Sequence, residues 1–429
     1  MPVRLQSVKK VLGLLGPGLI TGAADDDPSG IATYSQAGAQ SGYALLWTAL
    51  FMLPLQIAVQ ESCARIGAVT GKGLARLMRE HYSKPVLYIA VLLLLVANTI
   101  NIGADIGALA AAAQLLLPLP LVLFSVLFTV LIILLEVLLP YRVYSRVLKW
   151  LAVSLLAYPL TALIISEPWP TILRATFLPH IELSFSFFFV ITGVLGTTIS
   201  PYMFFWQAAE ETEEVRAQHL QRANRKPAIT RRFIRNLRID NVTGMVFSEI
   251  GTWAIIVVAA TVLHSHGLTT IRTSADAARA LEPLVHSFPQ AGYLAKLIFA
   301  TGIIGLGLLA IPVLAGSSSY ALTEAFGWPE GLDRKLTKAW AFYGIIVGGT
   351  LIGLLLNFIG IDPVKALVYS AVINGLVAAP LLALIALMAS NRAIMGRYRS
   401  GWLSRLLLWL TCLGMGAAAL GTIATLWHP

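Results

Sequence analysis

Three consecutive carboxylates, Asp25, Asp26 and Asp27, stand inside the first long apolar stretch of this chain, and Pro28 and Gly30 follow them closely. A carboxylate at the centre of a bilayer costs about 3 kcal/mol on insertion scales, so three in succession require a partner or a function. Proline removes a backbone donor and glycine weakens a helix, so we expect the helix to unwind beside Asp27. Unwound backbone offers carbonyl oxygens and the Asp27 carboxylate offers charge, which together predict a cation ligand.

A second apolar stretch, at 184–206, is interrupted in the same way by Ser200 and Pro201 and by the glycines before them. Interrupted apolar segments in corresponding positions of two halves are typical of inverted repeats with an ion site near the bilayer midplane. We therefore expect the two breaks to face each other. Asp26 is a second candidate ligand, and Asp25 a pathway residue. For both, another interpretation stays open, which is a water-filled vestibule or a cap on the following helix.

The elements that position these residues are membrane helices. The chain of 429 residues is 57% hydrophobic and 12% charged, with a mean hydropathy of +0.77, whereas a soluble domain is about 25% charged. A spanning helix needs about 20 largely apolar residues, and eleven stretches qualify. They are 11–39, 44–66, 85–117, 119–139, 147–166, 184–206, 241–264, 291–325, 338–358, 363–388 and 402–427. The predicted class is an all-α membrane protein.

The distribution of basic residues predicts the orientation. With the N-terminus in the cytoplasm, 26 of the 31 Lys and Arg fall on the cytoplasmic side, as the positive-inside rule requires. The C-terminus is then outside the cytoplasm, and we expect a bacterial inner membrane location. The net charge of +10 is loop charge and does not indicate nucleic-acid binding. The longest loops are the basic segment 208–240, with an expected lipid-facing role, and 265–290, where a short helix is expected at 275–284.

The chain reads as one transmembrane domain, 1–429, that contains two repeats. Five helices at 11–166 and five at 184–388 each begin with an interrupted helix, and 402–427 is an eleventh helix. Cys63 and Cys412 lie in apolar stretches, which leaves no disulfide framework. No spacing of residues suggests a nucleophile with its base, so an enzyme is not indicated. No obligatory protein partner is evident.

At the interrupted helices the sequence resembles the Nramp family of divalent metal transporters, and the resemblance covers nearly the whole chain. The matching strings are, in order, Gly16-Pro17-Gly18, Asp27-Pro28, 42–47, 64–67, 69–72, Ala104-Asp105, 319–321, Pro380 and 391–396. The resemblance implies a LeuT-type fold with two inverted five-helix repeats plus an eleventh transmembrane helix. It also implies that the Asp27 carboxylate and the main-chain carbonyl of Thr197 bind the metal, which is the transported substrate and not a cofactor.

Three departures from the family motifs bear on ion choice. Gly30 stands where the family has a ligand Asn, Ser200 where it has a ligand Met, and Tyr202 where it has His. A thioether selects softer transition metals, whereas oxygen ligands and water suit Mg, Ca and Mn. Without the Asn and Met side chains we expect a larger and more hydrated pocket, which suits Mg²⁺. The chain therefore resembles the divergent branch of Nramp-related magnesium transporters.

The predicted function is transport of Mg²⁺, and also Mn²⁺, by alternating access with the ion between helices 1 and 6. Tyr202 and Ala108 replace proton-exchanging groups of the family, so we expect no tight coupling to protons. One alternative is an ordinary proton-coupled Mn²⁺ or Fe²⁺ transporter of the Nramp type. A second is an amino-acid or organic-solute symporter of the same fold, which the three aspartates disfavour because they would repel a substrate carboxylate.

Other polar residues in apolar stretches are candidates for the pathway. Asp105 either matches a proton-pathway acid of the family or bonds to Asn98 or Asn101. Glu249 either lines the pathway or pairs within the bundle, and Asn374 is a possible oxygen donor to the site.

Charged residues near the predicted cytoplasmic ends have simpler interpretations. Glu61 and Arg65 are spaced for an (i, i+4) pair. The acidic run at 210–214 begins about 15 Å beyond Pro201 at 1.5 Å per residue, too far for a metal ligand. It is either a solvated helix end or a funnel that attracts cations.

Overall fold

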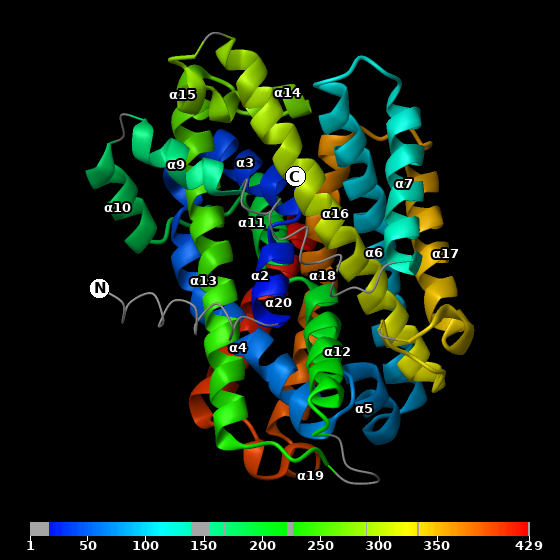
Figure 1. Ribbon diagram of the computed structural model, residues 1–429. Coiled ribbons are helices and arrows are strands. Elements are labelled where there is room, and N and C mark those ends of the chain that lie inside the picture. The colour runs from blue at the N-terminus through cyan, green and yellow to red at the C-terminus, as the bar shows by residue number, and fades with distance from the viewer. Residues whose placement is uncertain are drawn as a thin grey trace, which may run out of the picture.

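The computed structural model describes residues 17–138, 155–165, 168–220, 226–288, 290–332 and 334–427, and within these ranges it contains helices and no strand (Figure 1). The long helices are α4 (Trp47–Thr70), α6 (Lys84–Gln114), α7 (Leu121–Leu138), α13 (Arg231–Val262), α16 (Ala291–Phe326), α17 (Trp340–Leu356), α18 (Pro363–Ser390) and α20 (Trp402–Trp427). Two interrupted helices are built from α2 (Pro17–Asp25) with α3 (Pro28–Ser41), and from α11 (Phe185–Thr198) with α12 (Pro201–Ala217).

Shorter helices connect these elements. They are η1 (Gly42–Leu45), α5 (Leu74–His81), α9 (Ala157–Ile164), α10 (Trp169–Phe177), η3 (His264–His266), α14 (Ser274–Ala278), η4 (Arg279–Leu281), α15 (Glu282–Val285), η5 (Leu336–Lys338), α19 (Arg392–Met395) and η6 (Gly396–Tyr398). The short helices α14, η4 and α15 cover the segment 275–284, where a surface helix was expected.

The apolar helices agree with the predicted stretches wherever the structure describes them. Seven spans within the described ranges are long and apolar enough to cross a membrane, and an eighth is the pair Pro28–Leu45 and Trp47–Thr70, which is bent by 106°. The membrane class is thus confirmed. The count of eleven stays a prediction, because 1–16 and the first part of the predicted fifth span, 147–154, lie outside the described residues and α17 is short.

The basic segment 208–240 is more helical than predicted. α12 continues to Ala217, and α13 begins at Arg231, ten residues before the predicted span at 241. The prediction was wrong because hydropathy detects only the apolar part of a helix, whereas the first turns of α13 are rich in arginine. One of these, Arg238, donates to the Glu61 carboxylate at 2.8 Å, which Arg65 also contacts at 3.1 Å as predicted.

Small residues let the central helices approach closely. A Cβ on Gly22 of α2 would lie 2.4 Å from the Gly244 carbonyl oxygen of α13, and one on Gly196 of α11 would lie 2.2 Å from the Ala371 carbonyl oxygen of α18. Backbone contact of this kind is typical of membrane helices, which associate through small residues. Figure 1 shows α2, α3 and α11 at the centre of the bundle, with α13 on one side and α16 and α6 on the other.

Candidate cation site between the interrupted helices

The first break leaves Asp26 and Asp27 between two helices. α2 ends at Asp25 and α3 begins at Pro28, and Asp27 caps α3 with φ −64° and ψ 171°. Its Oδ1 accepts hydrogen bonds from the Ser29 hydroxyl at 2.6 Å and from the Gly30 backbone N–H at 2.8 Å. The predicted break is therefore present at Asp27, where Pro28 occupies the first helical position that tolerates it.

The second break lies between Thr198 and Pro201, again as predicted. Ile199 leaves the helical region with φ −118° and ψ 62°. The Ser200 hydroxyl donates to the carbonyl oxygens of Gly196 at 2.8 Å and Thr197 at 2.7 Å. Ser200 thus satisfies carbonyls that the break exposes, and the Thr197 carbonyl, a candidate ligand, already accepts one hydrogen bond. It keeps a second lone pair for a cation.

The two breaks face each other across the centre of the bundle. Ser29 Oγ and Thr197 Oγ1 are 3.4 Å apart, and the Tyr34 hydroxyl lies 2.8 Å from Thr198 Oγ1. The Tyr202 hydroxyl donates to the Ala24 carbonyl oxygen at 2.9 Å. Tyr202, predicted to lie on the pathway, therefore ties the start of α12 to the end of α2.

The space beside Gly30 is already filled, contrary to the larger pocket expected there. A Cβ on Gly30 would lie 3.2 Å from Thr197 Oγ1, 3.3 Å from Tyr34 Cε2 and 3.4 Å from the Asp25 carbonyl oxygen. With no side chain at position 30, the two interrupted helices lie in contact here, and no hydrated gap separates them beside Gly30. Gly30 allows the two helices to approach closely at this site, and it has no side chain that could bind the ion.

Asn101 of α6 is the site residue that the sequence did not assign. Its Nδ2 donates to Asp27 Oδ2 at 2.9 Å, while its Oδ1 has no partner although the residue is fully buried. An amide can turn over and present its oxygen instead, so Asn101 can exchange a hydrogen bond to Asp27 for a bond to a cation. Asn101 could have been identified from the sequence, because it is a polar residue on an apolar helix, four residues before Asp105.

Asp105 has neither of the amide partners considered for it. Both of its carboxylate oxygens are buried without a hydrogen-bond partner. Asn98 donates instead to the Leu314 carbonyl and to the hydroxyls of Ser317 and Ser318, while Asn101 is turned to Asp27. The structural interpretation of Asp105 is therefore wrong for this conformation, and the pathway interpretation stays a prediction.

Asp25, Asp26 and Glu249 are buried together, not solvated. The two aspartates are 0% exposed and Glu249 is 4% exposed, so the vestibule interpretation is wrong, and Asp27 supplies the cap of α3. Asp25 Oδ2 accepts from the Ser248 hydroxyl at 2.6 Å and from the Gln56 amide. Asp26 and Glu249 have no hydrogen-bond partner for any carboxylate oxygen.

Asn374 lies on the helix that packs behind the second break. It is fully buried on α18, and both of its amide atoms lack partners. The next residue, Gly375, approaches the Thr192 carbonyl of α11, because a Cβ there would lie 2.4 Å from that oxygen. The structure thus places Asn374 on the helix that packs against α11, with no hydrogen bond to Asp27 or Thr197.

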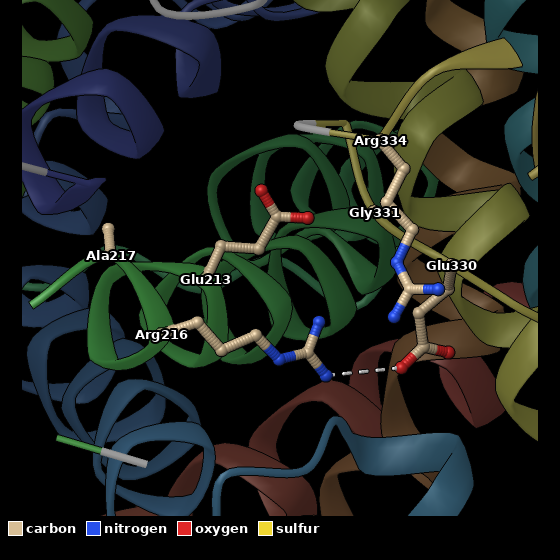
Figure 2. Close-up of a pocket in the computed structure, with 6 residues that line it drawn as sticks. All are labelled: Glu213, Arg216, Ala217, Glu330, Gly331 and Arg334. Atoms are coloured by element: carbon tan, nitrogen blue, oxygen red, sulfur yellow. Dashed lines mark ion pairs between the residues drawn. The ribbon is translucent and has the colours of Figure 1, made fainter. Parts of the chain in front are cut away.

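The acidic end of α12 forms a separate cavity of about 250 Å³ (Figure 2). It is lined by Glu213, Arg216, Ala217, Glu330, Gly331 and Arg334. Arg216 Nη2 lies 3.6 Å from Glu330 Oε1, the ion pair dashed in Figure 2. Burial raises the pKa of Glu330 above its ordinary value, and the Arg216 guanidinium opposes the shift.

Glu213 at this cavity accepts hydrogen bonds from the Tyr320 hydroxyl and from the Leu332 backbone N–H, the latter at 3.0 Å. Glu211 is buried and accepts from the Gln207 amide at 3.2 Å. The Glu213 contacts connect α12 to α16 and the loop that follows it, whereas the Glu211 contact lies within α12. The buried Glu211 is not part of a solvated helix end, whereas Glu213 is half-buried and lines the cavity, so the funnel interpretation stays a prediction.

The site offers oxygen atoms and one well-placed charge. Within the described ranges no Lys or Arg donates to Asp25, Asp26, Asp27, Asp105 or Glu249, and no three His, Cys, Asp or Glu side chains are grouped closely enough to hold a metal as they stand. A cation between the breaks would use the Asp27 carboxylate, the Asn101 amide oxygen and the Thr197 carbonyl oxygen. Such a set of oxygen atoms suits a hard cation.

Comparison with solved structures agrees on the fold. A manganese transporter from Eremococcus coleocola aligns with a TM-score of 0.72 at 16% identity, covering 97% of this chain and 87% of that one. MhsT, solved in complex with L-phenylalanine, aligns with a TM-score of 0.62 at 12% identity, covering 94% and 98%. The chain has the LeuT-type fold of these transport proteins, which the resemblance implied.

Sequence comparison defines the family. Residues 18–425 match the model of the Nramp family, described as natural resistance-associated macrophage protein-like. Two proteins named divalent metal cation transporter MntH are similar to it. The one from Ralstonia nicotianae is 28% identical over 100% of this chain and 92% of its own length, and the one from Aeromonas hydrophila is 27% identical over 91% and 90%. The chain belongs to the Nramp family.

Proposed function

We propose that this protein carries divalent metal cations across a membrane by alternating access, with the ion held between the two breaks. The observation that carries the proposal is the pair of interrupted helices in contact, with the buried Asp27 carboxylate at their junction. The metal ion is the cargo of such a transporter and not a cofactor, and the protein is not an enzyme. Its many apolar spans make it an integral membrane protein.

Asp27 would supply the charge that makes partial dehydration of the cation tolerable. Asn101 would turn its amide oxygen toward the ion. The free lone pair of the Thr197 carbonyl oxygen would be the third ligand that the protein supplies. Opening toward one side would then require the links between the half-helices to break. The Tyr202–Ala24 hydrogen bond is one such link, and the Glu213 contacts, which connect the end of α12 to α16 and the loop after it, would also have to break.

Two ion preferences remain in competition. The relatives are named divalent metal cation transporter and manganese transporter, which favours Mn²⁺ as the ion. These names support the alternative of a proton-coupled Mn²⁺ or Fe²⁺ transporter better than a magnesium transporter. The chemistry of Ser200 and Gly30 favours Mg²⁺, because the site lacks a soft thioether and its atoms are oxygens. Both preferences belong to one function, and the amino-acid alternative loses support because the family model covers the chain.

Purified protein in liposomes tests the function directly. Uptake of Mn²⁺ followed with a metal-sensitive dye, in competition with Mg²⁺, Ca²⁺ and Cd²⁺, should show transport that saturates and is abolished in Asp27→Asn. Competition by Mg²⁺ at concentrations similar to those of Mn²⁺ supports the magnesium preference, whereas competition by Cd²⁺ and indifference to Mg²⁺ supports the manganese type. Absence of uptake for all four ions would overturn the function.

The arrangement in the membrane is proposed with it. Eleven helices, a repeat at 11–166, a repeat at 184–388 and a last helix at 402–427 would place the N-terminus in the cytoplasm and the C-terminus outside. Support comes from the distribution of Lys and Arg in the sequence. Accessibility of single cysteines introduced near each end to an impermeant reagent would test the orientation in a bacterial plasma membrane.

A further inference from the structure

The structure assigns a second divalent-cation site to Asp26, Glu249 and Thr252, on the opposite side of the first break from Asp27. This inference rests on the proposed function and adds a second ion to the same route. Its first basis is unbalanced charge. Asp26 and Glu249 are buried, and none of their four carboxylate oxygens has a donor in hydrogen-bonding geometry, since the Ser248 hydroxyl near Asp26 donates to Asp25. Ionised groups in such surroundings are costly unless they are paired.

The neighbouring Asp25 differs from them, because one of its two carboxylate oxygens has donors. Its Oδ2 accepts from the Ser248 hydroxyl at 2.6 Å and from the Gln56 amide. On the α13 side of the break, Asp26 and Glu249 are the carboxylates that have no donor for either oxygen, and one divalent cation balances their combined charge when both are ionised. No Lys or Arg in the described part of the chain bonds to either of them.

Position separates this site from the one at Asp27. Asp27 Oδ2 accepts from Asn101 of α6. Asp26 instead lies against α13, because a Cβ on Gly251 would be 3.4 Å from Asp26 Oδ2. The break between α2 and α3 thus offers the Asp27 carboxylate to α6 and the Asp26 carboxylate to α13.

An independent observation comes from Thr252, which is fully buried and whose hydroxyl has no partner. Other buried threonines in these helices, such as Thr129 and Thr161, donate to the carbonyl four residues earlier at 2.7 Å, as helical threonines commonly do. Thr252 stands one turn after Ser248, which bonds to Asp25, so its face of α13 meets the break. Its oxygen is available there as a neutral ligand.

The three side chains suit a hard cation that keeps part of its water. No three His, Cys, Asp or Glu residues in the described ranges form a ready metal cluster, so the ion would have two carboxylates and a hydroxyl from the protein. Magnesium usually takes only one or two carboxylates and retains several waters. A soft transition metal would find no sulfur or imidazole in this set.

Counting bound ions tests the inference. Equilibrium dialysis of the purified full chain against Mg²⁺, with metal analysis, should give two ions per chain. Asp27→Asn and Glu249→Gln should each leave one, and the double variant none. Thr252→Val, which removes only the hydroxyl, should weaken the second ion about 5- to 10-fold. The matched control is Glu136→Gln on α7, another buried carboxyl without partners, which should still bind two.

The outcomes distinguish this inference from the proposed function. One ion per chain that is lost in Asp27→Asn, with stoichiometry and affinity unchanged in Glu249→Gln and Thr252→Val, would overturn the second site and leave the first intact. In that case Asp26 and Glu249 hold protons. Loss of one ion in Glu249→Gln but none in Asp27→Asn would support the second site and count against the first. If Glu249→Gln does not fold, Thr252→Val and Glu249→Asp give the same test.

Discussion

Replacing Asp27 by Asn removes the charge of the first site while keeping its hydrogen bonds. The asparagine Oδ1 can still accept from Ser29 and Gly30, which now lie at 2.6 Å and 2.8 Å. Its Nδ2 would meet the donor of Asn101, 2.9 Å away. Asn101 Oδ1 has no partner, so turning that amide over restores a hydrogen bond. We expect the free energy of unfolding to change by less than about 1 kcal/mol.

Ion binding should respond very differently. Leaving a buried ion without its partner costs about 3 to 5 kcal/mol, which corresponds to about 10²- to 10⁴-fold weaker binding at 1.4 kcal/mol per tenfold. Calorimetry with Mn²⁺ and Mg²⁺, flux in liposomes and thermal unfolding of the same preparation measure the two effects separately. A loss of transport in an Asp27→Asn protein that unfolds like the parent is the expected result.

The comparison with Asp26→Asn shows whether Asp27 has been placed correctly. Asp26 lies against α13, so its replacement should leave the affinity of the first ion within a few-fold of the parent. Normal transport by Asp27→Asn together with a dead Asp26→Asn would refute the assignment of Asp27. Equal loss of stability in both variants would refute the argument from the Asn101 amide.

Three further predictions concern selectivity, coupling and packing. Ser200→Met frees the Thr197 carbonyl and adds a thioether, so preference for Cd²⁺ over Mg²⁺ should rise about tenfold in uptake competition; unchanged selectivity would mean that position 200 does not face the ion. Metal uptake should proceed without stoichiometric proton movement. Internal acidification that scales with metal entry and disappears in Asp105→Asn would contradict this prediction and show that transport is coupled to protons. Gly67→Ala should destabilise by about 1 to 3 kcal/mol or more, because its Cβ would lie 2.1 Å from the Ala208 carbonyl oxygen, whereas Gly344→Ala, with nothing within 4 Å, should not lower the unfolding temperature.

Local chemistry made the broken helices predictable. Pro28 and Pro201 each stand at the first position of a helix, and proline disfavours helical backbone in the residue before it whatever surrounds the chain. Asp27 caps the helix that Pro28 begins, a role that depends on residues three positions apart. Hydropathy likewise identified the membrane class, since burial in lipid requires long apolar helices.

Rotations and contacts between helices were decided only by the tertiary structure. The sequence shows Asn101 and Asp105 on one helix, but not that Asn101 turns to Asp27 while Asp105 has no partner. It shows that Gly30 lacks a side chain, but not that Thr197 fills the space. It shows Asp26, but not that α13 lies against it. Such contacts depend on how each helix is rotated and how closely small residues let it approach its neighbours, and both are set by packing across the whole bundle.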